Sequence, residues 1–517
     1  MRIRLFVFFS IIALCANAQE TVKFNYNYPY QWQYDCNSMV IIDSTYYLSG
    51  NIARVLETCE YGIYGFHVTR INENGVRDTT IIFDTCNQIT YVGWQGSMFN
   101  KADTIVVIGI IYNEFYQSKV HVLQLTDNLD TISYNYYYTD TLAKKAFSGC
   151  NAKNGSIVFC GSNDSTHNES ASPSNTMTKP YLHKINCIGE TQWFHTYNVT
   201  GCIDDCWSSF RKVINAYDNS FLAIGITHDF NVYKNIIVKV DSLGNQKWVR
   251  YYGNPNYDNP YLLDIIETHD SCYIVCGAYT YGETGGGLYP YDGWLIKLDK
   301  DGNEKWNKKY RDYVINNTDW RDTITCTFVS IDELYDKGFA CIALVKSSEC
   351  LGQEFRIYRL DSVGNLLWTK LFTEFPECNN TYHPNTIKQT VDSGFAISGW
   401  VEYYEWNSST TQWDYSQRIF LIKTDSLGND VETTIRPVAA QPISKFELVC
   451  YPNPASGEFW VEAPGEDVLE VFATNGSTVL AVNMAQGLNR VDLCWVRPGM
   501  YLARLREAGV FGKIIIE

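Results

Sequence analysis

The sequence lacks the patterns by which several large protein classes are recognised. Only 8 of its 517 residues are histidine, and they are scattered without the spacing of a metal site or a catalytic triad. No G-x-S-x-G, H-E-x-x-H or phosphate-binding loop pattern is present. After residue 18 no stretch is apolar enough to cross a membrane as a helix, which needs roughly 20 residues. We therefore assign no catalytic residue, metal or cofactor, and expect no transmembrane segment in the mature chain.

Basic residues are also few, since 41 Lys and Arg stand against 57 Asp and Glu. A chain with a net charge of −16 is poorly suited to bind phosphates, so no nucleic-acid partner is expected. The composition is rich in tyrosine and asparagine and poor in lysine, which favours strands and turns over helices.

The first 18 residues have the composition of a secretory signal. Arg2 and Arg4 precede an apolar stretch at 5–15, and a small-x-small pattern ends at Ala18. We predict a signal peptide over 1–18, cleaved between Ala18 and Gln19. The alternative, an uncleaved anchor, is disfavoured because the apolar stretch is too short to span a bilayer.

A repeat dominates residues 34–431. In its clearest copies a strand ends in Asp, a tight turn closes with Gly, and a second strand begins near Trp. These copies are Asp241/Gly244/Trp248, Asp299/Gly302/Trp306 and Asp361/Gly364/Trp368. Looser copies centre on Asn72/Gly75, Thr126 to Asp130, Asn186/Gly189/Trp193 and Asp425/Gly428. An earlier hairpin in each unit brings the number of strands per unit to four.

The residue types explain how such a unit would fold. An Asp side chain bonds the backbone two residues on, and Gly accepts the left-handed conformation that closes the turn. Aromatic residues four apart after the turn, such as Trp306/Tyr310, share one strand face and are predicted to pack on the neighbouring unit. Seven four-stranded units predict an all-β fold, a seven-bladed β-propeller over 19–431. The units resemble those of a widespread family of secreted bacterial propeller repeats.

The ring of units must close. The seventh unit lacks the aromatic pair, whereas Phe24 and Tyr28 reproduce it ahead of the first unit. We predict that the N-terminal segment supplies the outermost strand of the last blade.

A linker is predicted over 432–446, followed by a domain over 447–517. Its motifs are Tyr451-Pro452-Asn453-Pro454, then Leu469 to Phe472 with Asn475-Gly476, and finally Pro498-Gly499-Met500-Tyr501. In this order they resemble the type A sorting domain of the type IX secretion system. The resemblance implies a small immunoglobulin-like β-sandwich that is recognised by the translocon and sortase. It also implies delivery through the periplasm to the medium or the outer cell surface.

Removal of the signal leaves 16 cysteines in a compartment where disulfides persist. Cys59 and Cys86 flank one hairpin of the first unit, and Cys350 and Cys378 occupy the same places in the sixth. Because the flanks of a hairpin lie close together, we predict the disulfides Cys59–Cys86 and Cys350–Cys378. Cys450 and Cys494 are the two cysteines of the C-terminal domain, and they either pair with each other or stay free.

Two sets of residues are candidates for ligand binding. The first comprises aromatics on expanded loops, namely Tyr279, Tyr289, Tyr291, Trp400, Trp406 and Trp413. The second comprises bases two residues before the turn Asp or Asn, namely Arg70, Lys184, Lys239, Lys297, Arg359 and Lys423. These bases would form a ring for an anion, or would pair locally with the Asp or Asn two residues on, which we favour.

Two functions are compatible with these patterns. The favoured one is a non-catalytic surface binding or adhesion module for a glycan or protein, because aromatics are arrayed without a convergent set of carboxylates. The alternative is a secreted glycan-degrading hydrolase or lyase, which would need paired carboxylates at the channel mouth.

Overall fold

The computed structural model describes residues 24–28, 33–54, 63–84, 89–93, 96–102, 104–112, 118–137, 144–164, 178–199, 207–229, 232–253, 261–280, 291–311, 325–346, 353–372, 381–407 and 412–430, and then 448, 450–451, 455, 458–463, 465–473, 478–492, 496, 498–506 and 510–516. The chain divides into two compact units, residues 1–432 and 433–517. The predicted signal peptide and linker lie outside the described residues, and the domain limits drawn from the sequence remain predictions. Within the described residues, no helix has the length and apolar character needed to cross a membrane.

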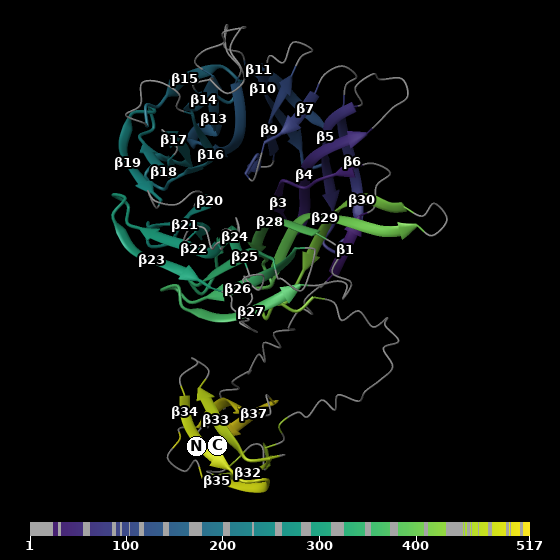
Figure 1. Ribbon diagram of the computed structural model, residues 1–517, viewed down its shortest axis with the longest axis vertical. Helices are drawn as coiled ribbons and strands as arrows, with labels where there is room; N and C mark the ends of the chain where they lie inside the picture. The colour runs from purple at the N-terminus through teal and green to yellow at the C-terminus, as the bar shows by residue number, and fades with distance from the viewer. Residues whose placement is uncertain are drawn as a thin grey trace, which may run out of the picture. The chain divides into compact units, whose positions relative to one another are not determined.

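The first unit is all-β and is built from antiparallel sheets that resemble propeller blades (Figure 1). Its strands are β1 (Phe24–Tyr28), β2 (Gln33–Tyr34), β3 (Ser38–Ile42), β4 (Thr45–Arg54), β5 (Ile63–Ile71), β6 (Arg77–Asp84), β7 (Ile89–Val92), β8 (Met98–Lys101), β9 (Thr104–Tyr112), β10 (Ser118–Thr126), β11 (Thr131–Tyr137), β12 (Lys144–Asn151), β13 (Ile157–Asp164), β14 (Thr178–Ile185), β15 (Thr191–Thr196), β16 (Trp207–Asn215), β17 (Phe221–Asp229), β18 (Val232–Val240), β19 (Gln246–Tyr252), β20 (Tyr261–Glu267), β21 (Tyr273–Thr280), β22 (Tyr291–Leu298), β23 (Glu304–Tyr310), β24 (Thr325–Glu333), β25 (Phe339–Lys346), β26 (Glu354–Leu360), β27 (Leu366–Phe372), β28 (Thr381–Gln389), β29 (Phe395–Asn407) and β30 (Gln412–Lys423).

Four consecutive strands pair in order in the sets β3–β6, β8–β11, β12–β15, β16–β19, β20–β23 and β24–β27. Two single parallel pairs, Tyr64↔Ile89 and Thr178↔Trp207, join neighbouring sets into larger sheets. The second strand of a set is almost wholly buried, as in β21, whereas the fourth is largely exposed, as in β23. Each sheet is therefore covered on both faces near its inner edge, where neighbouring sheets pack together.

The N-terminal strand closes this arrangement. β1 pairs antiparallel with β30, with Phe24 opposite Lys423 and Tyr28 opposite Ile419, so the last sheet has the order β1-β30-β29-β28. Leu48 of β4 and Leu421 of β30 belong to one buried cluster, which ties the last sheet to the first. The prediction that the N-terminus supplies the outer strand of the last sheet is confirmed.

The turns between third and fourth strands have the predicted chemistry. The Oδ1 atom of Asp361 accepts hydrogen bonds from the backbone N–H groups of Val363 (3.0 Å) and Asn365 (2.7 Å). Gly364 follows with a φ of 79°, a conformation that favours glycine. The turns at Asp241, Asp299 and Asp425 repeat these bonds. Where the repeat has lost its glycine, Leu129 adopts a φ of 69° instead.

The outer-strand aromatics pack on the next sheet, as predicted. A Cβ built on Gly364 would lie 3.0 Å from the indole of Trp306, so the ring of one sheet lies directly against the turn of the next. The Tyr310 hydroxyl donates to the Gly364 carbonyl at 2.6 Å. Tyr137 and Tyr197 make the same bond to Gly189 and Gly244. Blade-to-blade packing therefore explains the aromatic series.

The second unit has two small antiparallel sheets around one core. The strands β31 (Cys450–Tyr451), β32 (Glu458–Ala463) and β35 (Gly487–Asp492) form the first, and β33 (Asp467–Ala473), β34 (Thr478–Met484), β36 (Gly499–Leu505) and β37 (Val510–Ile516) form the second. Phe459 and Val461 from one sheet share a buried cluster with Leu469 and Ile514 from the other. The predicted Gly499 and Tyr501 lie on β36, and Tyr451 pairs with Trp460, whereas Pro452, Asn453 and Pro454 lie outside the described residues.

Candidate functional site

The inner strand of each sheet carries an irregularity that the sequence analysis did not predict. The pairing of the first and second strands shifts by one residue between Ala146 and Ser148, Phe210 and Lys212, Leu262 and Asp264, Phe328 and Ser330, and Pro384 and Thr386. Such a β-bulge inserts one extra residue and turns its side chain out of the regular alternation. In the first two sheets the inner strand is instead interrupted, between β2 and β3 and between β7 and β8.

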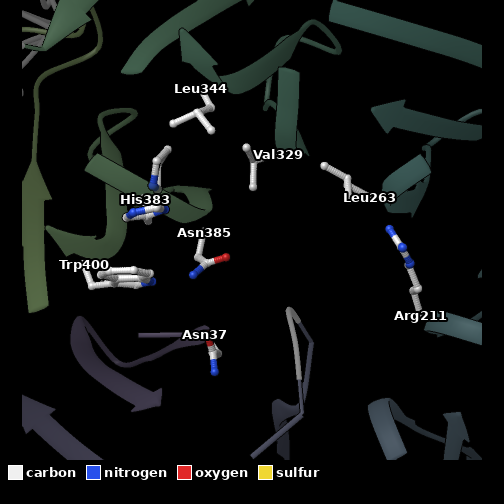
Figure 2. Close-up of a pocket in the computed structure, with 9 residues that line it drawn as sticks. Asn37, Arg211, Leu263, Val329, Leu344, His383, Asn385 and Trp400 are labelled. Atoms are coloured by element: carbon white, nitrogen blue, oxygen red, sulfur yellow. The ribbon is translucent and has the colours of Figure 1, made fainter. Parts of the chain in front are cut away.

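The extra residues line a common cavity. Arg211, Leu263, Val329 and Asn385 are bulge residues of four successive sheets, and Asn37 lies in the interruption between β2 and β3. Together with Leu344, His383, Pro384 and Trp400 they enclose about 310 Å³. Figure 2 shows Arg211 and Leu263 on one side of this space and His383 and Trp400 on the other. The repeated bulge thus builds one central cavity from separate sheets.

One wall of the cavity is aromatic. His383 and Trp400 are register partners on β28 and β29, and their rings stack with centroids 3.7 Å apart and planes 12° apart. Burial lowers the pKa of His383, although the nearby Glu402 opposes the shift. The Nε2 atom of His383 has no hydrogen-bond partner among the described residues, and Glu402 Oε1 lies 3.9 Å from it. His383 therefore contributes a neutral ring and an unsatisfied nitrogen near pH 7.

The opposite wall carries the positive charge. Among the described residues that line the cavity, Arg211 is the one with a permanent charge. Burial lowers its pKa, with Tyr261 opposing the shift, although an arginine remains protonated in proteins. Asn385 Nδ2 donates to the Cys36 carbonyl, which orients its amide across the junction between the last and first sheets.

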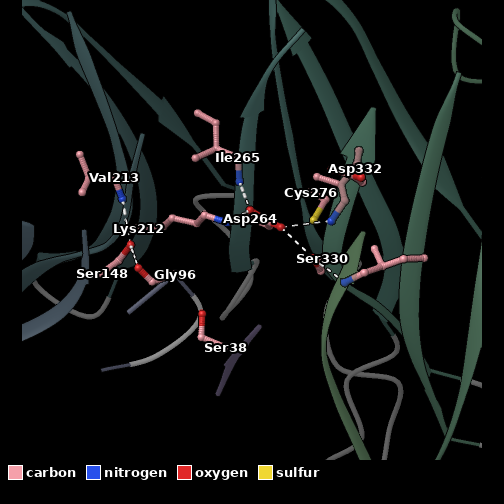
Figure 3. A network of polar contacts seen from close by, with 12 residues as sticks. Ser38, Gly96, Ser148, Lys212, Val213, Asp264, Ile265, Cys276, Ser330 and Asp332 are labelled. Carbon is pink, nitrogen blue, oxygen red and sulfur yellow. Dashed lines mark hydrogen bonds and ion pairs between the residues drawn. The ribbon is translucent and has the colours of Figure 1, made fainter. Parts of the chain in front are cut away.

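A buried polar belt supports the cavity from behind. The residue after each bulge is polar, as in Ser148, Lys212, Asp264, Ser330 and Thr386. Figure 3 shows how these side chains link neighbouring sheets through hydrogen bonds and ion pairs.

The belt follows a simple rule. A post-bulge side chain accepts a backbone N–H from the next sheet, as Ser148 Oγ does from Val213 (3.5 Å) and Asp264 Oδ2 does from Ile331 (3.1 Å). Lys212 cannot accept a hydrogen bond, and it instead forms an ion pair with Asp264, which is 2% exposed. Ser330 Oγ donates to the same carboxylate at 2.9 Å. The belt is therefore satisfied by internal partners.

The structure places the predicted aromatic residues in different surroundings. Trp400 lines the central cavity, whereas Tyr279 lines a second pocket of about 460 Å³ with Trp294, Asn307 and Lys309. The Nζ atom of Lys309 lies 3.4 Å from the centroid of the Tyr279 ring. Tyr291 stacks near Tyr261, with the two hydroxyls 3.3 Å apart.

The remaining three predicted aromatics are less fully described. Trp406 and Trp413 are register partners near the end of the β29–β30 hairpin, and their side chains lie outside the described part of the chain. Tyr289 lies outside the described residues altogether. The binding roles of all six aromatics remain predictions.

The basic residues before the turns do not form an anion-binding ring, but their predicted partners were wrong. Lys239, Lys297 and Lys423 are buried and pair with Asp218 (2.9 Å), Asp270 (2.9 Å) and Asp392 (2.8 Å). These carboxylates belong to the turn of the other hairpin, since the two strands lie side by side in the sheet. Burial alone would raise the pKa of Asp270, but hydrogen bonds from Thr268 and Lys297 hold it well below its usual range.

Cys59, Cys86, Cys350, Cys378 and Cys494 lie outside the described residues, so the three predicted disulfides remain predictions. Eight cysteines within the described ranges are free thiols, most of them buried in strands: Cys36, Cys150, Cys160, Cys187, Cys272, Cys276, Cys326 and Cys341. Burial raises the pKa of Cys276 well above its usual value, and the Asp264 charge adds to the shift. In the part of the chain that the structure describes, no three His, Cys, Asp or Glu side chains gather to hold a metal ion.

Comparison with known families identifies the C-terminal part. Residues 449–517 match the family described as the secretion system C-terminal sorting domain. The chain carries a type IX sorting domain. The protein is thus a substrate of the type IX secretion machinery, exported across the outer membrane to the medium or the cell surface.

The first unit has only distant relatives. No curated protein matched the chain. Similar solved structures include Drosophila Semaphorin 2a, with 10% identity over 96% of this chain and 97% of that one and a TM-score of 0.41. The polysaccharide lyase Uly1 has 9% identity over 78% and 99%, with a TM-score of 0.44. The β-propeller domain of the Trilobed protease from Pyrococcus furiosus has 8% identity over 75% and 93%, with a TM-score of 0.37. At these values no activity can be transferred to this chain.

Proposed function

We propose that this protein is a seven-bladed β-propeller which the type IX secretion system delivers through its immunoglobulin-like C-terminal domain. At the cell surface or in the medium it acts as a non-catalytic binding or adhesion module for a glycan or a protein. The translocon and sortase are its partners during delivery. The blade count rests on the six ordered four-strand sets together with the β28–β30 sheet that β1 completes.

The cavity built by the bulges is the observation that carries the binding proposal. It combines a stacked aromatic pair, two amides and one cation with apolar surface from Leu263 and Val329. Ligand sites typically pair such apolar walls with a few convergent polar groups. Trp400, singled out from the sequence as a binding residue, lies in this wall.

The long β29–β30 hairpin extends the same surface. Its register is regular from Ala396↔Lys423 to Asn407↔Gln412. Alternate residues of a strand share a face, so Trp406 stands on the same face of β29 as Trp400. A ligand anchored in the cavity would therefore meet a second pair of tryptophans, Trp406 and Trp413, further along the hairpin.

A second candidate function is a glycan-degrading hydrolase or lyase. The pairing of His383 with Glu402 beside the cavity supports it, since a histidine and a carboxylate can act as acid and base. The binding module is preferred because the described cavity-lining residues include no pair of carboxylates.

A screen of the mature full-length chain on a glycan array and on a peptide array tests the proposal. Binding that leaves the ligand intact by mass spectrometry supports the binding module. Shortened or unsaturated products would instead favour the second candidate. A folded protein that binds nothing on either array and cleaves nothing would contradict both.

A further inference from the structure

The bulge position is where the sheets share a backbone but differ in side chain. Arg211, Leu263, Val329 and Asn385 occupy the same place in four successive sheets, and all four line the cavity. Two of the four are aliphatic, so a packed wall at this position needs no charge. The arginine is an exception that the repeat itself does not explain.

The adjacent lysine shows that the charge at 211 is separate from the structural belt. Lys212 turns into the belt and forms its ion pair with Asp264. Arg211, one residue earlier, lines the cavity instead. Holding a cation away from water is costly unless an anion compensates it. An anionic group that enters the cavity would offset this cost.

The other lining groups indicate what carries the anion. Asn37 and Asn385 provide amides that can donate and accept hydrogen bonds, which suits hydroxyl groups. The Trp400–His383 stack and the aliphatic arc of Leu263 and Val329 provide flat apolar surface, which suits the C–H face of a ring. The volume of about 310 Å³ lies at the lower end of the usual range of roughly 300–1,000 Å³ for ligand pockets. It fits one terminal unit rather than an extended chain.

We infer that the central cavity binds the terminal residue of an acidic glycan, a carboxylate-bearing sugar whose carboxylate meets the Arg211 guanidinium. Arginine recognises carboxylates through two parallel hydrogen bonds. The asparagine amides receive the hydroxyls, and the Trp400 wall receives the ring. This inference rests on the proposed binding function and narrows its ligand to one chemical class.

The test uses three trisaccharide probes that differ at one group. The first ends in glucuronic acid, the second in its methyl ester and the third in glucose. Isothermal titration with the mature full-length chain should show the acid binding at least tenfold more tightly than either neutral probe. Loss of the carboxylate contact corresponds to roughly 10- to 100-fold in affinity.

Two variants locate the effect. Arg211→Leu copies the residue that the next sheet carries at the same position, so it should fold, and should lose the preference for the acid. Lys309→Gln removes the same charge from the second pocket and should change the affinity by less than twofold. Circular dichroism of both variants establishes that they remain folded.

The outcomes separate this inference from the proposal on which it rests. Equal affinity for the three probes, or an unchanged preference in folded Arg211→Leu, would overturn the acidic-sugar assignment while leaving a binding module in place. Tight binding to a peptide with none to any sugar would also overturn it. Absence of binding to every probe, glycan and peptide would contradict the proposed function itself.

Discussion

The outer and inner strands of the first unit repeat in different ways. Along the outer strands both backbone and side chains recur, so the turn at Asp361 and the contact between Trp306 and Gly364 reappear around the molecule. Along the inner strands the bulge recurs, but its residue changes from Arg211 to Leu263 to Asn385. Strict repetition accompanies packing between sheets, whereas variation on a fixed backbone accompanies the wall of the cavity.

The polar belt lies between these two regions and belongs with the first. Most of its members are serine or threonine that bond the next sheet, and Lys212 and Asp264 are the charged exception. Because both charges are buried and satisfied internally, we assign them to structure rather than to ligand binding. The predictions that follow test this division, from the largest expected effect to the smallest.

Asp264→Ala should be the most damaging substitution. It leaves Lys212 without its counter-charge and removes the acceptor used by Ser330 and Ile331. Breaking a buried pair on one side costs about 3–5 kcal/mol. Urea unfolding followed by tryptophan fluorescence measures the loss.

The matched control is the double change Lys212→Ser with Asp264→Ser, which copies the neighbouring Ser148 and Ser330. It should recover most of the stability lost in the single variant. A double variant as unstable as Asp264→Ala would show that the belt does not follow the serine rule.

Gly364→Val tests the outer strands. The position has a φ of 79°, and a Cβ there would lie 3.0 Å from Trp306. Left-handed backbone costs a side-chain-bearing residue about 1–2 kcal/mol, and the clash adds to it, so we expect a loss of about 2–3 kcal/mol. The reverse change, Leu129→Gly, relieves a φ of 69° and should stabilise by about 1 kcal/mol. A neutral Gly364→Val would contradict the packing described for these turns.

Asp35→Asn tests a titrating carboxylate at the interruption between β2 and β3. Burial raises the pKa of Asp35 to about 6, although hydrogen bonds from Asn51 oppose the shift. Because the folded pKa lies above the unfolded value, stability falls as pH rises from about 4 to 6 and stays lower above 6. A shift of this size is worth about 3 kcal/mol, less about 1 for the weakened bond to Asn51.

The variant should therefore be about 1–2 kcal/mol more stable than the natural protein at pH 8 and show no gain at pH 4. Urea midpoints at the two pH values give the comparison. A gain that is equal at both values would exclude titration of Asp35 as its cause.

Much of the fold could be predicted because local chemistry determines it. The Asp and Gly of each turn and the tryptophan after it stand at fixed spacing, and the closing strand could be recognised by Phe24 and Tyr28. The sorting domain was recognised from motifs such as Tyr451 and Tyr501. These signals depend on neighbours in the sequence and needed no knowledge of contacts between sheets.

The cavity could not be predicted in the same way. A bulge depends on pairing between two strands, and neither Phe210-Arg211-Lys212 nor Leu262-Leu263-Asp264 marks it alone. Alignment of the inner strands would have revealed it, since an apolar residue, a variable residue, a polar residue and an apolar residue recur in order. Trp400 was found by its loop composition, whereas Arg211, His383 and Asn385 were missed. The predicted pairs Cys59–Cys86 and Cys350–Cys378 await peptide mapping of the unreduced protein.

The division between the two kinds of position is tested most directly by two tryptophan substitutions in the mature chain. Trp306→Ala should lower the free energy of unfolding by about 2–3 kcal/mol, since the ring is partly buried against the next sheet, and leave affinity for the glucuronic-acid trisaccharide within twofold. Trp400→Ala should reduce that affinity at least tenfold and cost less than about 1 kcal/mol of stability, because its ring faces the cavity. Measurement of both quantities on both variants would contradict the account if Trp400→Ala bound as well as the natural protein, or if Trp306→Ala lost binding while folded.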